Sequence, residues 1–208
     1  MHRTTDESTR TRILDAAEHA FADAGFAGAR VAAITGEAGV NKAMLYYYFG
    51  NKEALYQAVL DRVFDRVVAM AEAVDADVHG PPVDALLTFF DGYATILGER
   101  PRIVRILLRA MLDPSPDTQA YMFGRATAVV QALTHQVQRG QADGSLDPAL
   151  SAPLVPPALI APIVFGALTA PTLAAATGVP PEALRQLWLT NVRQLLTHGL
   201  LARPEVRP

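Results

Sequence analysis

The chain has 208 residues, half of them apolar, which is enough to bury one substantial core or one core with a smaller second domain. It contains no cysteine, so disulfides, thiolate metal sites and cysteine nucleophiles are excluded. The formal net charge is −3, and the first 54 residues carry six Lys or Arg against seven Asp or Glu. Any DNA-binding surface must therefore arise from the placement of basic residues, because no overall positive charge is present.

Targeting and membrane signals are absent from the sequence pattern. The stretch from Met1 to Glu7 is polar and lacks the apolar segment of a signal peptide. Proline, glycine or charge interrupts each apolar run before the ~20 residues that a membrane span requires. We therefore expect a cytoplasmic protein with no membrane partner.

The first predicted helix follows a flexible arm over residues 1–8. Apolar residues recur at helical spacing over residues 9–24, so one stripe of this helix faces a core. Gly25 stands where a helix end requires a left-handed residue, and Phe26 is then placed to contact Phe21. This pattern predicts a helix that ends in a Schellman motif.

Two short helices are predicted next, over residues 31–38 and 42–48. Only Gly39, Val40 and Asn41 separate them. The glycine permits a sharp turn, the valine supplies an apolar plug, and the asparagine is a favoured N-cap. Two short helices joined by a tight turn that contains glycine predict a helix-turn-helix.

A long helix over about residues 52–76 then begins after Asn51, which is a second N-cap candidate. At 1.5 Å per residue it would extend about 38 Å, which is long enough to connect two domains. The Gly and Pro residues at 79–82 end it. We expect a helix-turn-helix domain over residues 9–55 and a C-terminal domain over residues 77–208.

The C-terminal part favours longer and more apolar helices. They are expected at residues 84–97, 101–112, 117–139, 157–177 and 181–200. Gly140 and Gly178 stand where two of these helices would end. No run alternates as a strand would, so the prediction is an all-α fold of about nine helices, with a three-helix N-terminal domain and a larger helical domain.

The second helix of a helix-turn-helix enters the major groove of DNA. Leu45 and Phe49, one turn apart, would face the core and leave Lys42, Tyr46 and Tyr47 exposed. Free N–H groups at the helix N-terminus, lysine and tyrosine hydroxyls all bind phosphate oxygens, and the alternative is an ordinary short core helix. The expected DNA-binding residues are Arg30, Asn41, Lys42, Ala43, Met44, Tyr46, Tyr47, Tyr48 and Lys52, with Ala43 and Met44 nearest the base edges.

Two further sets of residues in the C-terminal part are candidates for ligand contact. Arg102, Arg105 and Arg109 share one helix face; they form an anionic effector site, a surface that pairs with acids of the first or fourth helix, or a solvated face. Aromatic and methionine side chains at helical spacing line an apolar effector pocket or pack as ordinary core. These side chains are Phe89, Phe90, Tyr93, Met111, Tyr121, Met122, Phe165 and Trp188.

Catalytic and metal-binding motifs are missing from the sequence. The five histidines are scattered, with no pair at metal-ligand spacing. No Gly-rich phosphate loop, G-x-S-x-G or H-E-x-x-H motif is present. We therefore expect no catalytic residue, metal or cofactor, and no enzyme activity.

The helix-turn-helix region carries a specific set of residues. They are Thr9-Arg10-Thr11-Arg12-Ile13-Leu14-Asp15-Ala16-Ala17, Phe21, Gly25-Phe26, Ile34, Glu37-Ala38-Gly39-Val40, Lys42, Leu45-Tyr46-Tyr47-Tyr48-Phe49 and Asn51-Lys52-Glu53-Ala54-Leu55. With them, about a quarter of the chain resembles the DNA-binding domain of the TetR family of transcriptional regulators. Arg30 departs from the family pattern, which usually has Thr or Ser at this cap. Thr35 stands where the family usually has alanine, and it is followed by Gly36, a poor helix former.

The resemblance implies a homodimer that binds a pseudo-palindromic operator in double-stranded DNA. It implies a C-terminal domain for effector binding and dimerisation, and the last two long helices, rich in Ala, Leu and Val, are the expected dimer seam. The function expected is a repressor that a small, lipophilic effector releases from DNA. An activator is a variant of this hypothesis, and the alternative is a ligand carrier or enzyme with a vestigial helix-turn-helix.

Overall fold

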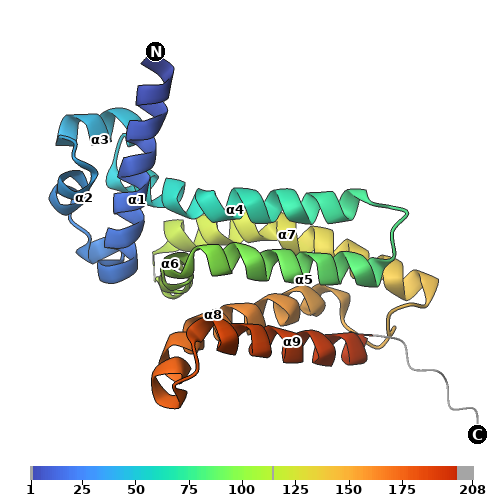
Figure 1. Cartoon of the computed structure of the whole chain (residues 1–208). Helices are drawn as coiled ribbons and strands as arrows, with labels where there is room; N and C mark the ends of the chain where they lie inside the picture. The colour runs from blue at the N-terminus through green and yellow to red at the C-terminus, as the bar shows by residue number, and fades with distance from the viewer. Residues whose placement is uncertain (1, 114, 201–208) are drawn as a thin grey trace, which may run out of the picture. The chain divides into compact units, whose positions relative to one another are not determined.

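The computed structural model describes residues 2–113 and 115–200, and the side chains of residues 6–113 and 115–198. Over these residues the chain is helical and contains no strand, so the all-α prediction is confirmed (Figure 1). The helices are α1 (His2–Gly28), α2 (Val31–Ala38), α3 (Lys42–Phe49), α4 (Lys52–Ala76), α5 (Pro82–Glu99), α6 (Pro101–Leu112), α7 (Pro116–Asp143), α8 (Val155–Thr177) and α9 (Pro181–Leu200), with a short 3-10 helix at Ala152–Leu154.

The chain forms two compact units. The first comprises residues 1–65 and 102–119, and the second comprises residues 66–101 and 120–208. The first unit thus holds α1, α2, α3, the beginning of α4 and α6. We expected α6 in the C-terminal domain, so the structure differs from the sequence-based boundary at this helix.

The core of the first unit contains Ile34 and Leu45, both fully buried, from the two short helices. An aromatic cluster lies beside the end of α1: the ring centroid of Tyr56 lies 4.9 Å from that of Phe21 and 5.2 Å from that of Phe26. The Phe21 and Phe26 centroids are 6.3 Å apart, so the predicted contact at this helix end is confirmed. The backbone leaves the helical conformation at Gly25 (φ 70°, ψ 177°), but the predicted Schellman ending there was wrong, because Gly25 is not in the αL conformation and α1 continues to Gly28.

Contacts between α6 and the end of α1 explain why α6 belongs to the first unit. Arg109 Nη2 donates a hydrogen bond to the Asp23 carbonyl at 3.2 Å, and Arg105 Nη2 lies 3.7 Å from the Asp23 carboxylate. Arg109 also fills the space beside Gly25, where a Cβ would lie 2.9 Å from Nη1. Of the three alternatives for these arginines, the structure therefore supports pairing with the first helix, while Arg102 is exposed.

In the second unit, α8 packs against both α9 and α5 (Figure 1). Its interior contains Phe89, Phe90 and Leu159, all buried. At Gly166, α8 approaches α9 so closely that a Cβ there would overlap Cδ1 of Trp188. The Trp188 indole N–H donates a 2.8 Å hydrogen bond to a backbone carbonyl of α8, which fixes the ring in this contact.

The end of α4 is tied to α7 within the second unit by polar side chains. His135 Nδ1 lies 2.7 Å from Asp75 Oδ1, and the amide of the fully buried Gln136 donates to the same oxygen at 3.0 Å. Arg139 donates to the carbonyls of Asp77 at 3.0 Å and Val78 at 2.7 Å. These bonds hold the last turn of α4 and the segment that follows it against α7.

Several expectations about helix ends were wrong. The helix α1 begins at His2, so residues 2–8 are helical where an arm was expected. The helix α7 continues past Gly140 to Asp143, and Gly144, with φ of 78°, takes the left-handed position instead. Gly140 is instead a point of close packing, because a Cβ there would lie 2.6 Å from the Leu146 side chain.

The expectation that no apolar run is long enough to span a membrane was also wrong for one stretch. Among the described residues, the helical stretch at 152–177 passes a test of length and composition for a membrane span. Pro162 and Pro171 lie inside α8 without ending it. A long apolar helix of a soluble protein can have the same length and composition.

Two buried tyrosines, Tyr56 and Tyr93, should make the protein less stable at high pH. Burial raises the pKa of Tyr93 to about 12 from its ordinary value of 10, and burial together with Asp113 raises the pKa of Tyr56 to about 12 against the opposing effect of Arg109. Because the folded state has the higher pKa, the stabilisation is fully present below pH 10 and is lost as the pH rises from 10 to 12. We expect a loss of up to about 3 kcal/mol for each tyrosine.

Urea unfolding at a series of alkaline pH values measures this loss. The variants Tyr56→Phe and Tyr93→Phe cannot ionise at these positions, so each should flatten the alkaline limb of the stability profile. An alkaline limb that is unchanged in both variants would show that other groups cause the loss.

Candidate functional site

The turn between α2 and α3 has the geometry expected for a helix-turn-helix. Gly39 adopts the left-handed conformation with φ of 65°, and its N–H donates to the Gly36 carbonyl at 3.3 Å. The Val40 N–H donates to the Thr35 carbonyl at 3.0 Å. The helix α2 is regular over the predicted residues 31–38, and Arg30 precedes it as an exposed N-cap residue without a side-chain capping bond.

The helix α3 presents one face to the core and the other to solvent. Leu45 is fully buried and Phe49 is 8% exposed. Tyr47 is 80% exposed and Tyr46 is 46% exposed, and Lys42, Ala43 and Met44 are exposed as well. The predicted division of this helix into an inward and an outward face is confirmed, and its outward face combines a cation, hydroxyl groups and small or apolar side chains.

The N-terminus of α3 is capped by Asn41. Its side-chain oxygen accepts a 2.9 Å hydrogen bond from the Met44 N–H. Asn41 is itself in an extended conformation, with φ of −88° and ψ of 165°, as an N-cap residue requires. The cap holds one N–H of the first turn and leaves the N–H groups of Lys42 and Ala43 directed out of the helix end, where an anion is favoured.

Removal of this cap should destabilise the first unit. We expect Asn41→Ala to lower the free energy of unfolding by about 1 kcal/mol, whereas Asn41→Asp, which also caps, should leave it nearly unchanged. Thermal or urea unfolding followed by circular dichroism measures both. If Asn41→Ala is as stable as the parent chain, the capping bond contributes nothing to the fold.

Tyr48 does not belong to the exposed surface with Tyr46 and Tyr47. It is half-buried, and its hydroxyl donates a hydrogen bond to a carboxylate oxygen of Asp6 in α1. This bond to the carboxylate raises the pKa of Tyr48. Tyr48 was expected among the DNA-binding residues, but its hydroxyl is engaged by Asp6, because α1 begins early enough to bring Asp6 to it.

Two arginines of α1 lie near α3 and were missed in the sequence. The Arg10 guanidinium carbon lies 5.3 Å from the Phe49 ring centroid, and Arg12 Nη1 lies 3.8 Å from the position of a Cβ on Gly39. Both side chains are exposed. They place two cations beside the turn and α3. The spacing of polar residues identifies the polar face of α1 in the sequence. It does not show which part of that face lies beside α3.

Lys52, the predicted DNA-binding lysine at the start of α4, packs against an aromatic ring. Lys52 Nζ lies 4.8 Å from the Phe26 ring centroid, within the range of a cation–π contact. This contact holds the ammonium at the beginning of α4. The position of the Lys52 side chain is thus fixed by this contact. That it binds a DNA phosphate stays a prediction.

Many of the acids in the first unit are engaged in internal pairs. Arg62 Nη1 lies 2.7 Å from Asp15 and 3.5 Å from Glu18, and His19 Nδ1 lies 2.5 Å from Glu37. The partner Arg62 lies beyond the window of the first 54 residues used in the charge count. The near balance of charge in that window therefore does not describe the surface around α3, where Lys42, Arg10 and Arg12 are exposed alongside an acid, Asp6.

The predicted effector-pocket residues fall into different environments. Phe89, Phe90, Tyr93 and Met122 are buried, and the rings of Phe89 and Tyr93 stack at 5.9 Å. Tyr121 is partly exposed, while Phe165 and Met111 are 54% and 65% exposed, and Met111 belongs to the other unit. The first four are buried side chains of the second unit, whereas Phe165 of the same unit is exposed.

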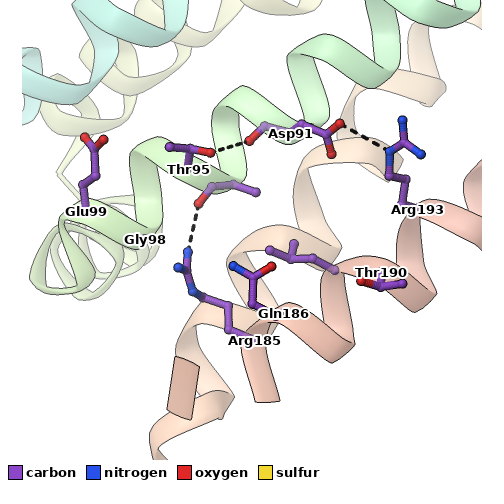
Figure 2. Close-up of a pocket in the computed structure, with 10 residues that line it drawn as sticks. Asp91, Thr95, Gly98, Glu99, Arg185, Gln186, Thr190 and Arg193 are labelled. Atoms are coloured by element: carbon purple, nitrogen blue, oxygen red, sulfur yellow. Dashed lines mark hydrogen bonds and ion pairs between the residues drawn. The ribbon is translucent and has the colours of Figure 1, made fainter. Parts of the chain in front are cut away.

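A hollow lies instead on the other side of α5, between α5 and α9 (Figure 2). Its volume is about 470 Å³, and no predicted pocket residue lines it. Its walls are Asp91, Ala94, Thr95, Gly98 and Glu99 from α5, and Arg185, Gln186, Leu189, Thr190 and Arg193 from α9. We call this hollow the α5–α9 groove.

Comparison with known proteins adds to this geometry. Residues 13–59 match the model of the N-terminal domain of bacterial regulatory proteins of the tetR family. The HTH-type transcriptional regulator TtgR of Pseudomonas putida is 31% identical over 160 residues, which cover 71% of this chain and 75% of TtgR. The HTH-type transcriptional repressor SCO4008 of Streptomyces coelicolor is 31% identical over 155 residues, covering 71% of this chain and 72% of that protein.

Solved structures share the fold. A TetR transcriptional regulator from Chloroflexus aurantiacus superposes with a TM-score of 0.73 at 22% identity, over 96% of this chain and 100% of the other. The transcriptional regulator FadR from Bacillus subtilis, solved in complex with stearoyl-CoA, superposes with a TM-score of 0.72 at 18% identity, over 91% and 98% of the two chains.

Proposed function

Because this chain belongs to the TetR family of bacterial regulatory proteins and is a helix-turn-helix transcriptional regulator, we propose that it is a homodimeric repressor that a small-molecule effector releases from DNA. The operator is a pseudo-palindrome, with the two α3 helices of the dimer in major grooves about one DNA turn, ~34 Å, apart. The observation that carries this proposal is the outward face of α3.

The exposed residues of this face match the chemistry of a DNA backbone. Lys42 and the free N–H groups of the first turn bind phosphate, and the hydroxyls of Tyr46 and Tyr47 donate to phosphate while their rings cover apolar sugar edges. Ala43 and Met44 lie on the same exposed surface and are the residues nearest base edges. Arg30 and Lys52 bind phosphate on either side.

A gel-shift titration with the DNA upstream of the chain's own gene tests this proposal. We expect nanomolar to micromolar binding that survives excess nonspecific DNA and weakens steeply with salt. Selection from a random DNA library extends the test beyond one fragment. If no sequence is selected and no salt-dependent binding is seen, the helix-turn-helix is vestigial and the protein is a ligand carrier or an enzyme.

The dimer forms through the exposed apolar faces of α8 and α9. Phe165 and Leu168 of α8 are 54% and 42% exposed, and Leu187 and Leu195 of α9 are 60% and 74% exposed. Apolar side chains at this exposure on two adjacent helices favour burial against a second copy of the same pair, as in a four-helix seam. This also accounts for an α8 that is long and apolar with much of its surface uncovered.

Sedimentation velocity measures the assembly directly. We expect a dimer for the parent chain and a monomer for the Leu187→Glu/Leu195→Glu variant. Leu112→Glu is the matched control, because Leu112 is 82% exposed and lies on α6. A dimer that persists in the double variant would place the interface elsewhere.

The effector that we expect is a small, lipophilic molecule. The expected site for a lipophilic effector lies in the second unit, where Phe89, Phe90, Tyr93 and Met122 are buried. The fold accommodates such ligands, as FadR was solved with stearoyl-CoA. A thermal-shift screen of lipophilic compounds, followed by gel shift at saturating ligand, tests this part; equal operator affinity with and without a ligand shows that it is not the effector.

A further inference from the structure

The α5–α9 groove has an arginine of α9 at each end, and one of the two forms an ion pair across the groove. At one end Arg193 Nε lies 3.3 Å from an Asp91 carboxylate oxygen. At the other end Arg185 Nη1 donates to the Ala94 carbonyl at 3.1 Å, next to Gly98 and Glu99 (Figure 2). The two arginines are eight residues apart on α9, which corresponds to about 12 Å along the helix axis.

Neutral side chains line the middle of the groove. Thr95 from α5 and Gln186 and Thr190 from α9 carry hydroxyl or amide groups, and Ala94 and Leu189 add small apolar area. The acids and arginines of the lining balance, with Asp91 and Glu99 on one wall and Arg185 and Arg193 on the other. The groove therefore suits a hydrophilic ligand whose own net charge is zero.

The two arginines differ in how firmly they are held. Arg185 has an 18% exposed side chain and also binds Glu182 at 2.7 Å, and this pairing lowers the pKa of Glu182. A Cβ on Gly98 would overlap Arg185 Nη1, so the absent side chain makes room for the guanidinium. The Arg185 side chain is thus held in place by the protein and forms a fixed part of the groove wall.

The ion pair between Arg193 and Asp91, at the opposite end, is weak enough for a ligand to replace it. The Arg193 and Asp91 side chains are 47% and 56% exposed, and exposed pairs of this kind contribute about 1 kcal/mol or less. Their single contact, from Nε, engages one of the five N–H donors of a guanidinium. A ligand carboxylate on the outer fork of Arg193 and a ligand ammonium on Asp91 would leave neither protein charge uncompensated.

The groove stays open in the proposed dimer. At 100° per residue, Leu195 lies about 160° around α9 from Arg193, and Leu187 lies about 100° from Gln186. The apolar face offered to a second copy therefore points away from the groove wall. On α5, likewise, Asp91 and Thr95 are exposed, whereas Phe90 and Tyr93 face the core.

We propose that the α5–α9 groove binds a small hydrophilic zwitterion of the amino-acid type, with its carboxylate on Arg193, its ammonium on Asp91 and its polar side chain along Thr95, Gln186 and Thr190. A simple carboxylate fits less well, because it would compete with Asp91 for Arg193 and leave Asp91 unpaired. The site is separate from the aromatic core considered for a lipophilic effector, and its occupation does not depend on DNA binding.

Calorimetry and amide chemical shifts with the full-length protein test the proposal, using the standard L-amino acids as probes. The best binder is then compared with two analogues, one lacking the amine and one lacking the carboxylate. We expect the zwitterion to shift the amides of Thr95, Gln186 and Thr190, and each analogue to bind at least about tenfold more weakly, which is about 1.4 kcal/mol.

Variants of Arg193 and Asp91 provide a second test of the proposal. Arg193→Gln and Asp91→Asn should each weaken the zwitterion by about tenfold or more, Arg193→Lys should restore part of the loss, and Arg102→Gln, an exposed arginine outside the groove, should change nothing. Unfolding temperatures establish that each variant is folded. Lack of binding by every amino acid at millimolar concentration overturns the proposal, as does binding that is insensitive to Arg193→Gln.

Operator binding of the same proteins without ligand separates this inference from the proposed function. A protein that binds the zwitterion but no DNA contradicts the repressor and leaves the groove site standing. A protein that binds its operator but no zwitterion contradicts only the groove site.

Discussion

Replacement of Lys42 by alanine should weaken operator binding by about 30-fold at physiological salt and leave the fold unchanged. Lys42 is the first residue of α3, and its side chain is exposed, so the substitution removes no core contact. In the proposed complex each protomer would lose one phosphate contact and the dimer would lose two; at about 1 kcal/mol for each contact the sum is about 2 kcal/mol. The slope of log affinity against log salt should fall in magnitude by about 2.

Fluorescence anisotropy titrations over a range of salt concentrations measure both quantities. Arg102→Ala is the control, because Arg102 is an exposed cation of the same unit on α6. An unchanged salt slope in Lys42→Ala would show that this ammonium does not contact phosphate. A lowered unfolding temperature would show that Lys42 has a structural role instead.

Substitution of Gly166 by alanine should destabilise the second unit by about 2 kcal/mol. The added methyl group would overlap Cδ1 of Trp188 and lie 2.6 Å from its Nε1, and this indole is held by its hydrogen bond to the Pro162 carbonyl. Overpacking of this kind costs up to about 3 kcal/mol, and the better helix propensity of alanine offsets about 1 kcal/mol. The added methyl group should also push α8 and α9 apart. Because these two helices form the proposed dimer interface, we expect weaker dimerisation.

Gly124→Ala is the matched comparison for this substitution. Gly124 also lies inside a helix of the second unit, and a Cβ there would meet no atom within 4 Å, so alanine should stabilise by up to about 1 kcal/mol. Urea unfolding can follow the fluorescence of Trp188, which is the chain's only tryptophan. Equal stability of Gly166→Ala and the parent chain would mean that the indole moves aside without cost.

Local signals predicted much of the helical architecture. The bounds 31–38, 101–112 and 181–200 agree with α2, α6 and α9. These helices begin or end at residues with strong local preferences, such as Pro101 and Pro181 in a first turn and Gly39 after a last turn. The helix-turn-helix was predictable for the same reason, since its turn and cap involve only neighbours in sequence.

Features that depend on distant neighbours were not predictable in the same way. The hydroxyl of Tyr48 meets Asp6, a pairing that leaves no local pattern. The contact of Arg109 with α1 was one of three alternatives, and its spacing alone could not select among them. The periodicity of α5 identified Phe89 and Phe90 as an apolar face. It did not show that the hollow lies beside Asp91 and Thr95, because a cavity is set by the helix on its other side.

The two faces of α3 also have a consequence for evolutionary change. Folding depends on Leu45, Phe49 and the cap, whereas the outward positions Ala43 and Met44 are exposed. Substitutions at those outward positions therefore carry little penalty in stability, since surface changes away from caps and cores are nearly neutral. Duplicated copies of this gene would be free to drift toward new operators while the same eight-residue helix continued to fold.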